Sequence, residues 1–406
     1  MNQFTKKVIG KNNIPETDKG VSFLDLISII SNDKLGNKLL ELLDKESYKD
    51  DFIKIPGAAT LVSIQKKINK RYWKEDLESS LENINLYNDK KFSINFNSLE
   101  KNEYFKDLKL KKISTEPLYS ASRDFFSSLL NMDKYASSLI SKGHRDIVDA
   151  NLNLLKTIQN TKRKYRVLHD REENLFFLRA IVSLNKYFDY NNNIAVVIGL
   201  LMLHNESKSS KIDYKLLRCE YNESFIRMFF ESTQVNELEN IGQVKNIIQI
   251  SNDEIKREAL RFTGVCTISF KDSQNQLGEL FIQPQDIKSK ILSIKHNQVP
   301  STAIEELSKI NNSKKVHQEL YNDITKISKI KDPEQIKYLV RKKIENAKGE
   351  EVKRFKQQYL DELKNGAKNI IQLLTIFKKM ELLSNEDIES SEYIRYIIYN
   401  ALIEKK

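Results

Sequence analysis

The most apolar stretch of the chain, residues 175–203, constrains the fold most strongly. It reads LFFLRAIVSLNKYFDYNNNIAVVIGLLML, in a protein whose mean hydropathy is −0.53 and in which 30% of the residues are charged. A stretch this apolar is buried in a protein whose surface is otherwise polar. We therefore expect the remaining elements to pack around it.

The stretch divides at three asparagines, residues 191–193, because asparagine favours turns. Before them, apolar residues recur at helical spacing, which predicts an amphipathic helix over residues 174–188. After them, residues 194–203 are apolar on every side, and the run is about half of the roughly 20 residues that cross a bilayer. We expect a helix buried on all sides there, with a buried strand as the alternative.

Helical patterns dominate the rest of the chain. Proline is absent between Pro117 and Pro284, which permits long helices, and we also expect helices over residues 146–168 and 222–230. The C-terminal quarter is predicted to be all-helical. One of its helices begins at residues 332–334, which supply a capping aspartate, a proline and an acid of the first turn.

Two short runs depart from the helical pattern. Residues 265–270 and 277–282 are rich in β-formers and flank a polar loop, which predicts a hairpin. The sequence therefore predicts a mainly α, multi-helix protein with a small β-hairpin insertion near residues 263–283.

A chain of 406 residues is long for a single core, so we expect two or three domains. The predicted divisions are an N-terminal basic helical region over residues 1–116, a central helical core with the hairpin over residues 117–300, and a C-terminal helical bundle over residues 301–406.

The cysteine content and the N-terminal sequence bear on location. Cys219 and Cys266 lack the spacing of metal ligands and are too few for a disulfide framework. The opening residues MNQFTKKVIGKNN lack the apolar core of a secretory signal. We expect a cytoplasmic protein with free thiols and no membrane association.

Positive charge is concentrated in one part of the chain. The formal net charge is +11, and residues 61–170 contain 21 lysines and arginines against 14 acids, whereas residues 1–60 contain nine of each. The abundance of lysine, isoleucine and asparagine is typical of an AT-rich genome, but a genome-wide bias would spread lysine evenly. The uneven distribution therefore predicts a basic face.

Two basic clusters in this region are interleaved with aromatic residues, which makes them candidate nucleic-acid-binding sites. The first lies on a helix predicted over residues 58–74, whose apolar side directs the basic residues to solvent. The second lies on the helix predicted over residues 146–168. Solvated helix faces are the alternative reading of both. The candidate binding residues are Lys66, Lys67, Lys70, Arg71 and Trp73 of the first cluster, and Lys162, Arg163, Lys164 and Arg166 of the second.

Arg163 and His169 are six residues apart and bracket KYRVL on a predicted helix. This spacing resembles that of HEPN ribonucleases over about seven residues. The resemblance implies a dimer cleft in which histidine transfers protons and arginine stabilises phosphate charge. Lys164 departs from the polar residue usual after the arginine, which puts the resemblance in doubt. An ordinary basic helix end is the alternative reading.

Other catalytic patterns carry little weight in this sequence. The acids Asp272, Glu279 and Asp286 in and beside the hairpin could serve a metal-dependent nuclease, but loop acids are normally solvated. The five histidines have no paired-ligand spacing, and phosphate-binding or dinucleotide-binding glycine motifs are absent from the sequence. We therefore expect no catalytic residues, no metal and no cofactor.

These observations favour a non-enzymatic nucleic-acid-binding component of a larger bacterial assembly. DNA is the expected ligand, contacted through its phosphate backbone without sequence specificity, and other protein subunits are expected partners. An antiviral defence or mobile-element system is one setting that suits such a chain. The alternatives are a divergent nuclease, either HEPN-like or metal-dependent, and a helical scaffold or interaction subunit.

Overall fold

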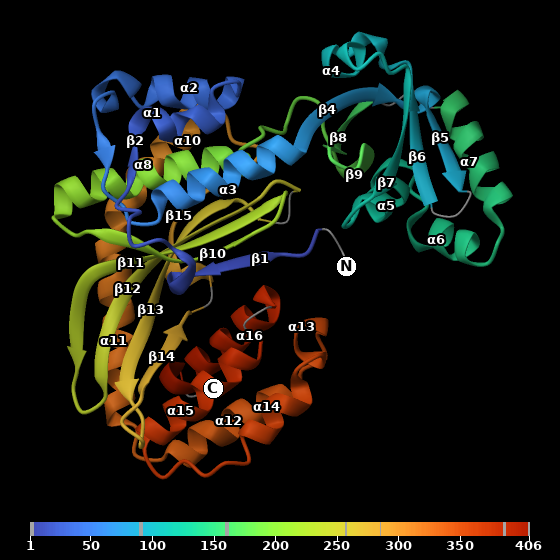
Figure 1. Cartoon of the computed structure of the whole chain (residues 1–406). Coiled ribbons are helices and arrows are strands. Elements are labelled where there is room, and N and C mark those ends of the chain that lie inside the picture. Colours follow the sequence, from blue (N-terminus) through green and yellow to red (C-terminus); the bar gives the residue numbers. More distant parts are fainter. Residues whose placement is uncertain are drawn as a thin grey trace.

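The computed structural model describes residues 4–88, 92–158, 162–255, 258–284, 286–384 and 387–404. Over these residues the protein is mixed α/β and contains one sheet of seven strands and one of six (Figure 1). The prediction of a mainly α, multi-helix protein with a small β-hairpin insertion is therefore wrong, because strands make up 28% of the structure. The division into domains after residues 116 and 300 stays a prediction.

The larger sheet is antiparallel and curves into a half-barrel. Its strand order is β1-β10-β11-β12-β13-β14, and β15 also pairs with β13. The predicted hairpin is confirmed as β13 and β14, but it belongs to this sheet and is not an insertion. The strands are β1 (Lys7–Gly10), β10 (Tyr214–Tyr221), β11 (Phe225–Leu238), β12 (Gly242–Asp253), β13 (Leu260–Lys271), β14 (Leu277–Ile282) and β15 (Lys290–Ile294).

Helix α8 (Asn192–Ser210) packs on this sheet and confirms the predicted buried central helix. The side chain of Asn191 caps it by accepting a hydrogen bond from the Ile194 N–H at 3.0 Å. Residues 194–203 are all buried. Gly199 lets the helix approach β12 closely, because a Cβ atom at this position would lie 2.9 Å from Ile250 Cδ1.

The N-terminal segment supplies further helices, which lie beside α8 (Figure 1). A two-stranded sheet, β2 (Val21–Ser22) with β3 (Phe52–Ile53), accompanies them. The helices are α1 (Phe23–Ile27), α2 (Lys34–Leu42) and α3 (Ala58–Arg71), and α10 (Pro300–Leu307) joins them from later in the chain.

The second sheet has the order β4-β8-β9-β7-β6-β5, in which β7 and β9 are parallel neighbours. Its helices share one apolar core with it. The strands are β4 (Tyr72–Ser80), β5 (Ile84–Asn88), β6 (Phe92–Asn97), β7 (Lys112–Pro117), β8 (Lys162–Asp170) and β9 (Leu175–Val182). The helices are α4 (Glu103–Asp107), α5 (Ala121–Asp124), α6 (Asp133–Ser141) and α7 (Arg145–Ile158).

Three predicted helices are strands in whole or in part. Residues 175–182 form β9, residues 162–170 form β8 after α7 ends, and residues 225–230 belong to β11. All three strands are buried on both faces over most of this length, so they lack the alternation that marks a half-exposed strand. Their aromatic and β-branched residues favour extended structure. Periodicity alone could not make that distinction.

The C-terminal region is helical, as predicted, and α12 begins at the expected aspartate, proline and acid. Helices α15 and α16 pack on β14 at the edge of the larger sheet. There Glu381 Oε2 accepts a hydrogen bond from the Phe281 N–H, and its other oxygen bonds Arg395. The helices are α9 (Asp286–Ser289), α11 (Ser313–Ile324), α12 (Pro333–Asn346), α13 (Glu350–Lys353), α14 (Lys356–Glu362), α15 (Ile370–Leu383) and α16 (Ile388–Tyr399).

Among the described residues, none of the helices combines the length and the apolar character needed to span a bilayer. Even α8 is strongly apolar over only part of its length, because its last six residues are NESKSS.

Candidate nucleic-acid interface

Helix α3 carries the first basic cluster. Its buried side contains Leu61, Ile64 and Ile68, as the sequence predicted, so the lysines at the intervening positions face solvent. Lys66, Lys67 and Lys70 are exposed, and the described part of the chain offers them no ion-pair partner. The three ammonium groups therefore remain available to an external anion.

A shallow groove of about 370 Å³ runs beside these lysines. Its lining combines apolar side chains with the lysine stems, and its single acid, Asp25, bonds the hydroxyl of Ser22 at 2.8 Å. The groove places positive charge at the rim of an apolar floor. Its lining residues are Val21, Asp25, Ala59, Val62, Ser63, Lys66, Lys67 and Lys70.

Arg71, at the end of α3, is already paired. Its Nη2 lies 2.7 Å from Asp170 Oδ2 and its Nη1 lies 3.0 Å from Glu172 Oε2. Asp170 is fully buried and also accepts the Glu172 N–H. The hydrogen bond with Asp170 raises the pKa of Arg71. This pair joins the end of α3 to the end of β8, so Arg71 has a structural role.

Trp73 is the second residue of β4 and also contacts neighbouring side chains. Its ring stacks on Tyr104 with centroids 4.8 Å apart, and the guanidinium of Arg171 lies 4.9 Å from its centroid. Its Nε1 donates to Glu75 at 3.0 Å. The predicted stacking surface for a nucleobase is therefore largely occupied by the protein's own side chains.

The second basic cluster lies on strand β8 and not on a helix. Strand β4 runs antiparallel beside it and supplies acids. Lys162 pairs with Glu78 at 3.0 Å, and Lys164 lies 3.7 Å from Asp76. Arg166 is buried and pairs with Asp76 and Asp189. Arg163 alone of the four lacks an acidic partner among the described residues.

The HEPN-like spacing does not form a catalytic pair in this chain. Arg163 and His169 lie on one extended strand, so six residues separate them by about 20 Å. Both ring nitrogens of His169 are occupied, Nδ1 by the Tyr104 hydroxyl at 2.7 Å and Nε2 by Asn174 Oδ1 at 3.1 Å. Burial lowers the pKa of His169. His169 therefore connects the end of β8 to Tyr104 and Asn174 by hydrogen bonds.

A buried ionic network between the two sheets was not predicted. Glu254, after β12, is fully buried and bonds Lys74 of β4 at 2.6 Å and Arg179 of β9 at 2.7 Å. Burial would raise the pKa of Glu254, but Lys74, Arg179 and Arg166 lower it to about 2. Glu254 also accepts the Asn192 N–H at the start of α8. The network connects the second sheet to the core of the first.

The acids of this network and the remaining histidines do not assemble a metal site. Across the described ranges, no group of three or more histidine, cysteine, aspartate or glutamate side chains is arranged to hold an ion. Of the hairpin acids, Glu279 is exposed, and Asp272 is half-buried and accepts backbone N–H groups of its own loop.

Comparison with protein-family models, with curated proteins and with solved structures found no match to this chain. The comparisons and the described structure contain nothing that points to DNA in particular or to antiviral defence, and we withdraw both expectations. Of the nine predicted site residues, the structure leaves Lys66, Lys67 and Lys70 grouped and unpaired. The acids on β4 and directly after β8 were the sequence signal for the ion pairs of Arg71, Lys162, Lys164 and Arg166. The pairing of β4 with β8 brings these acids close to the basic residues, and proximity in the sequence does not.

Proposed function

We propose that this chain binds the phosphate backbone of a nucleic acid through α3, without catalysing a reaction on it. One observation carries the proposal: Lys66, Lys67 and Lys70 lie on adjacent turns of one helix, exposed and without acidic partners among the described residues. Like charges three and four residues apart disfavour a helix by about 0.2–0.5 kcal/mol per pair. Binding of an external anion, such as a nucleic-acid phosphate, explains why three lysines lie together on α3.

The geometry suits phosphates. Lys66 and Lys70 are separated by about 6 Å along the helix axis, which is similar to the spacing of successive backbone phosphates. Lysine offers a flexible point charge, so such contacts position a duplex or a single strand and do not read its sequence. The interface is smaller than the sequence suggested, because the ion pairs of Arg71, Lys162, Lys164 and Arg166 remove them from it.

We also infer a cytoplasmic location and partner subunits in a larger bacterial assembly. The free, buried thiols of Cys219 and Cys266 support the location, since a reducing compartment keeps such groups unpaired. The α3 groove supports a partner, because it is a concave surface in which the half-buried Ala59 lies beside the stems of exposed lysines.

Equilibrium binding to short duplex and single-stranded DNA and RNA of mixed sequence tests the proposal. The triple variant Lys66→Gln, Lys67→Gln, Lys70→Gln should lose at least tenfold in affinity at low salt, equally for all sequences. A matched control, Lys329→Gln, Lys331→Gln, Lys348→Gln, removes the same charge from exposed C-terminal positions and should retain binding.

Three outcomes would contradict the proposal. The unaltered protein could fail to bind any of the four nucleic acids at low salt, or the two triple variants could lose affinity equally. Cleavage of DNA or RNA by the purified chain, with or without magnesium, would contradict the non-enzymatic part and favour a nuclease.

A further inference from the structure

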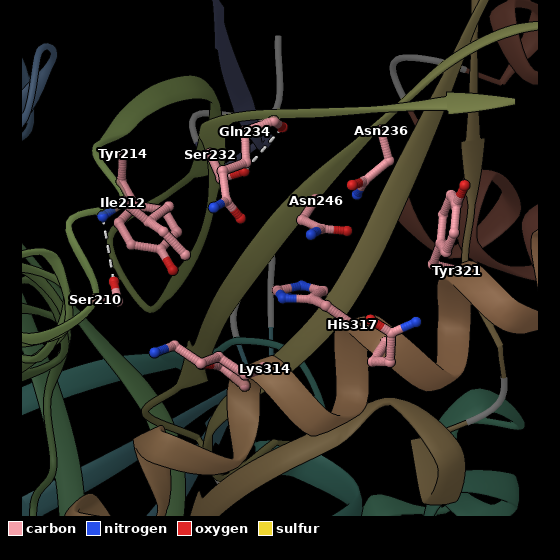
Figure 2. A pocket seen from close by; sticks show the side chains of 12 residues that line it. Ser210, Ile212, Tyr214, Ser232, Gln234, Asn236, Asn246, Lys314, His317 and Tyr321 are labelled. Carbon is pink, nitrogen blue, oxygen red and sulfur yellow. Dashed lines mark hydrogen bonds between the residues drawn. The ribbon is translucent and has the colours of Figure 1, made fainter.

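A second hollow, remote in sequence from α3, lies between α11 and strands β10–β12 of the larger sheet. Its volume is about 290 Å³. Figure 2 shows side chains of β11 and β12 on one side of it and those of α11 on the other. The lining residues are Ser210, Ile212, Tyr214, Ser232, Gln234, Asn236, Asn246, Ser313, Lys314, His317, Gln318 and Tyr321.

The face of the larger sheet changes from apolar to polar side chains at this hollow. Strand β12 presents Ile248 and Ile250 to the core, whereas Asn246 occupies the same face two residues earlier. The pairing of β11 with β12 is interrupted between Glu231 and Val235. At this interruption the two strands carry hydroxyl and amide side chains, and the face is apolar again at Val244 and Leu238.

Two polar side chains on α11 are buried, and one of them has no hydrogen-bond partner among the described residues. Ser313 is 1% exposed, and its hydroxyl has no hydrogen-bond partner among the described residues. His317, one turn later, is 6% exposed, and its Nε2 lies 3.0 Å from the carbonyl oxygen of Ile247. A carbonyl can only accept, so Nε2 carries the proton and Nδ1 presents a lone pair. Burying the Ser313 hydroxyl without a partner is costly, which favours a polar occupant.

The protonation state of His317 is fixed by its surroundings. Burial lowers its pKa to about 4, so the ring is neutral near pH 7 and Nδ1 accepts hydrogen bonds. Opposite it, Asn246 uses its carbonyl oxygen for the Cys266 thiol at 3.6 Å and leaves its N–H groups free. The Tyr214 hydroxyl, likewise without a partner in the described structure, adds a further donor.

The charge of the lining narrows the ligand class. The twelve lining residues include no aspartate or glutamate and one lysine, Lys314, at the start of α11. A cation or a metal ion would find no counter-charge here, whereas a ligand with one anionic group can pair with the exposed ammonium of Lys314. The volume is near the lower limit for ligand pockets and admits one sugar or nucleoside.

We propose that this hollow binds a phosphorylated sugar, either free or as a mononucleotide. Its phosphate lies at Lys314, and its hydroxyls donate to His317 Nδ1 and exchange hydrogen bonds with Ser313 and Asn246. The site is independent of the nucleic-acid surface on α3, because the two share no residue.

Calorimetric titration of the full chain with ribose 5-phosphate, ribose, adenosine monophosphate and inorganic phosphate tests the proposal. Ribose 5-phosphate should bind more tightly than either ribose or phosphate. Lys314→Gln should weaken it roughly 10- to 100-fold, the effect of losing one charged hydrogen bond. Lys315→Gln, the exposed neighbour outside the lining, should leave affinity unchanged.

Asn246→Ala and Ser313→Ala should each reduce affinity roughly 2- to 10-fold with the circular dichroism spectrum preserved. Tighter binding of adenosine monophosphate assigns the site to nucleotides, and equal binding assigns it to sugar phosphates. The absence of binding at millimolar concentration, inorganic phosphate binding as tightly as ribose 5-phosphate, or equal losses in Lys314→Gln and Lys315→Gln would overturn the proposal. The triple lysine variant of α3 should bind as the unaltered chain does.

Discussion

Asp76 of β4 lies opposite Arg166 of β8, with its Oδ1 3.1 Å from the Nε of Arg166. Arg166 is 1% exposed and also donates to the backbone oxygen of Glu254. Arg166, which the sequence predicted to bind phosphate, therefore connects the two sheets inside the protein. The two partners are 90 residues apart in the chain, and the pair exists only because β4 and β8 are neighbours.

Asp76→Ala should destabilise the protein by about 2–4 kcal/mol. Removing one partner leaves the buried guanidinium of Arg166 undercompensated, and the remaining contact with Asp189 keeps the cost below that of a fully isolated charge. Urea denaturation of the variant and the unaltered chain measures the difference.

The neighbouring pair provides the control for this prediction. Lys162 and Glu78 are both about half exposed, so Glu78→Gln should cost less than about 1 kcal/mol. Equal effects of the two substitutions would show that Asp76 and Arg166 form an ordinary surface pair.

The central apolar stretch shows what the sequence could and could not predict. Residues 194–203 form the expected buried helix, because ten residues apolar on every side, preceded by a capping asparagine, favour that structure. Residues 175–182 satisfy helical spacing equally well, yet they form a central strand between β8 and β7. Long-range pairing decides between these states, and a local pattern contains no information about it.

The same limit applies to the candidate site. The buried face of α3 follows from helical periodicity, so the exposure of Lys66, Lys67 and Lys70 was predictable. The ion pairs that neutralise the basic cluster on β8 could not be predicted, because the acidic partners come from β4, a strand far away in the sequence. The polar hollow on α11 also escaped prediction, because Asn246 and His317 are brought together by the packing of a helix on a sheet.

The network around Glu254 should make stability depend on pH. Lys74, Arg179 and Arg166 hold its pKa at about 2, below its ordinary value of 4.5. A carboxyl group with a lowered pKa stabilises the folded state fully above the unfolded pKa, and this contribution is lost as the pH falls towards 2. We expect the free energy of unfolding to fall by about 3 kcal/mol across this window because of Glu254.

Measuring unfolding at a series of pH values, with Glu254→Gln for comparison, tests this dependence. The variant should be less stable near pH 7 and should show a shallower decline below pH 4.5. Parallel curves for the two proteins would contradict a role for the Glu254 charge.

Gly199 is a test of the close packing between α8 and β12. A Cβ atom here would lie 2.9 Å from Ile250 Cδ1 and 3.6 Å from Ile250 Cγ2. Overpacking such a buried contact typically costs about 1–3 kcal/mol, which equals or exceeds the roughly 1 kcal/mol gained in helix propensity. Gly199→Ala should therefore lower the melting temperature.

Gly366→Ala is the matched control, because a Cβ atom there meets nothing within 4 Å. It should leave the melting temperature unchanged or raise it slightly, since alanine restricts the unfolded chain more than glycine does. A stabilising effect of Gly199→Ala would show that α8 lies farther from β12.

The salt dependence of nucleic-acid affinity tests the central claim most directly. Each phosphate neutralised on a duplex contributes about 0.9 to the slope of log K against log salt concentration. Changing Lys66, Lys67 and Lys70 to glutamine should therefore flatten the slope by about 2–3 units, whereas the Lys329, Lys331 and Lys348 control should keep the slope of the unaltered chain. Identical slopes for all three proteins would contradict a phosphate-binding face on α3.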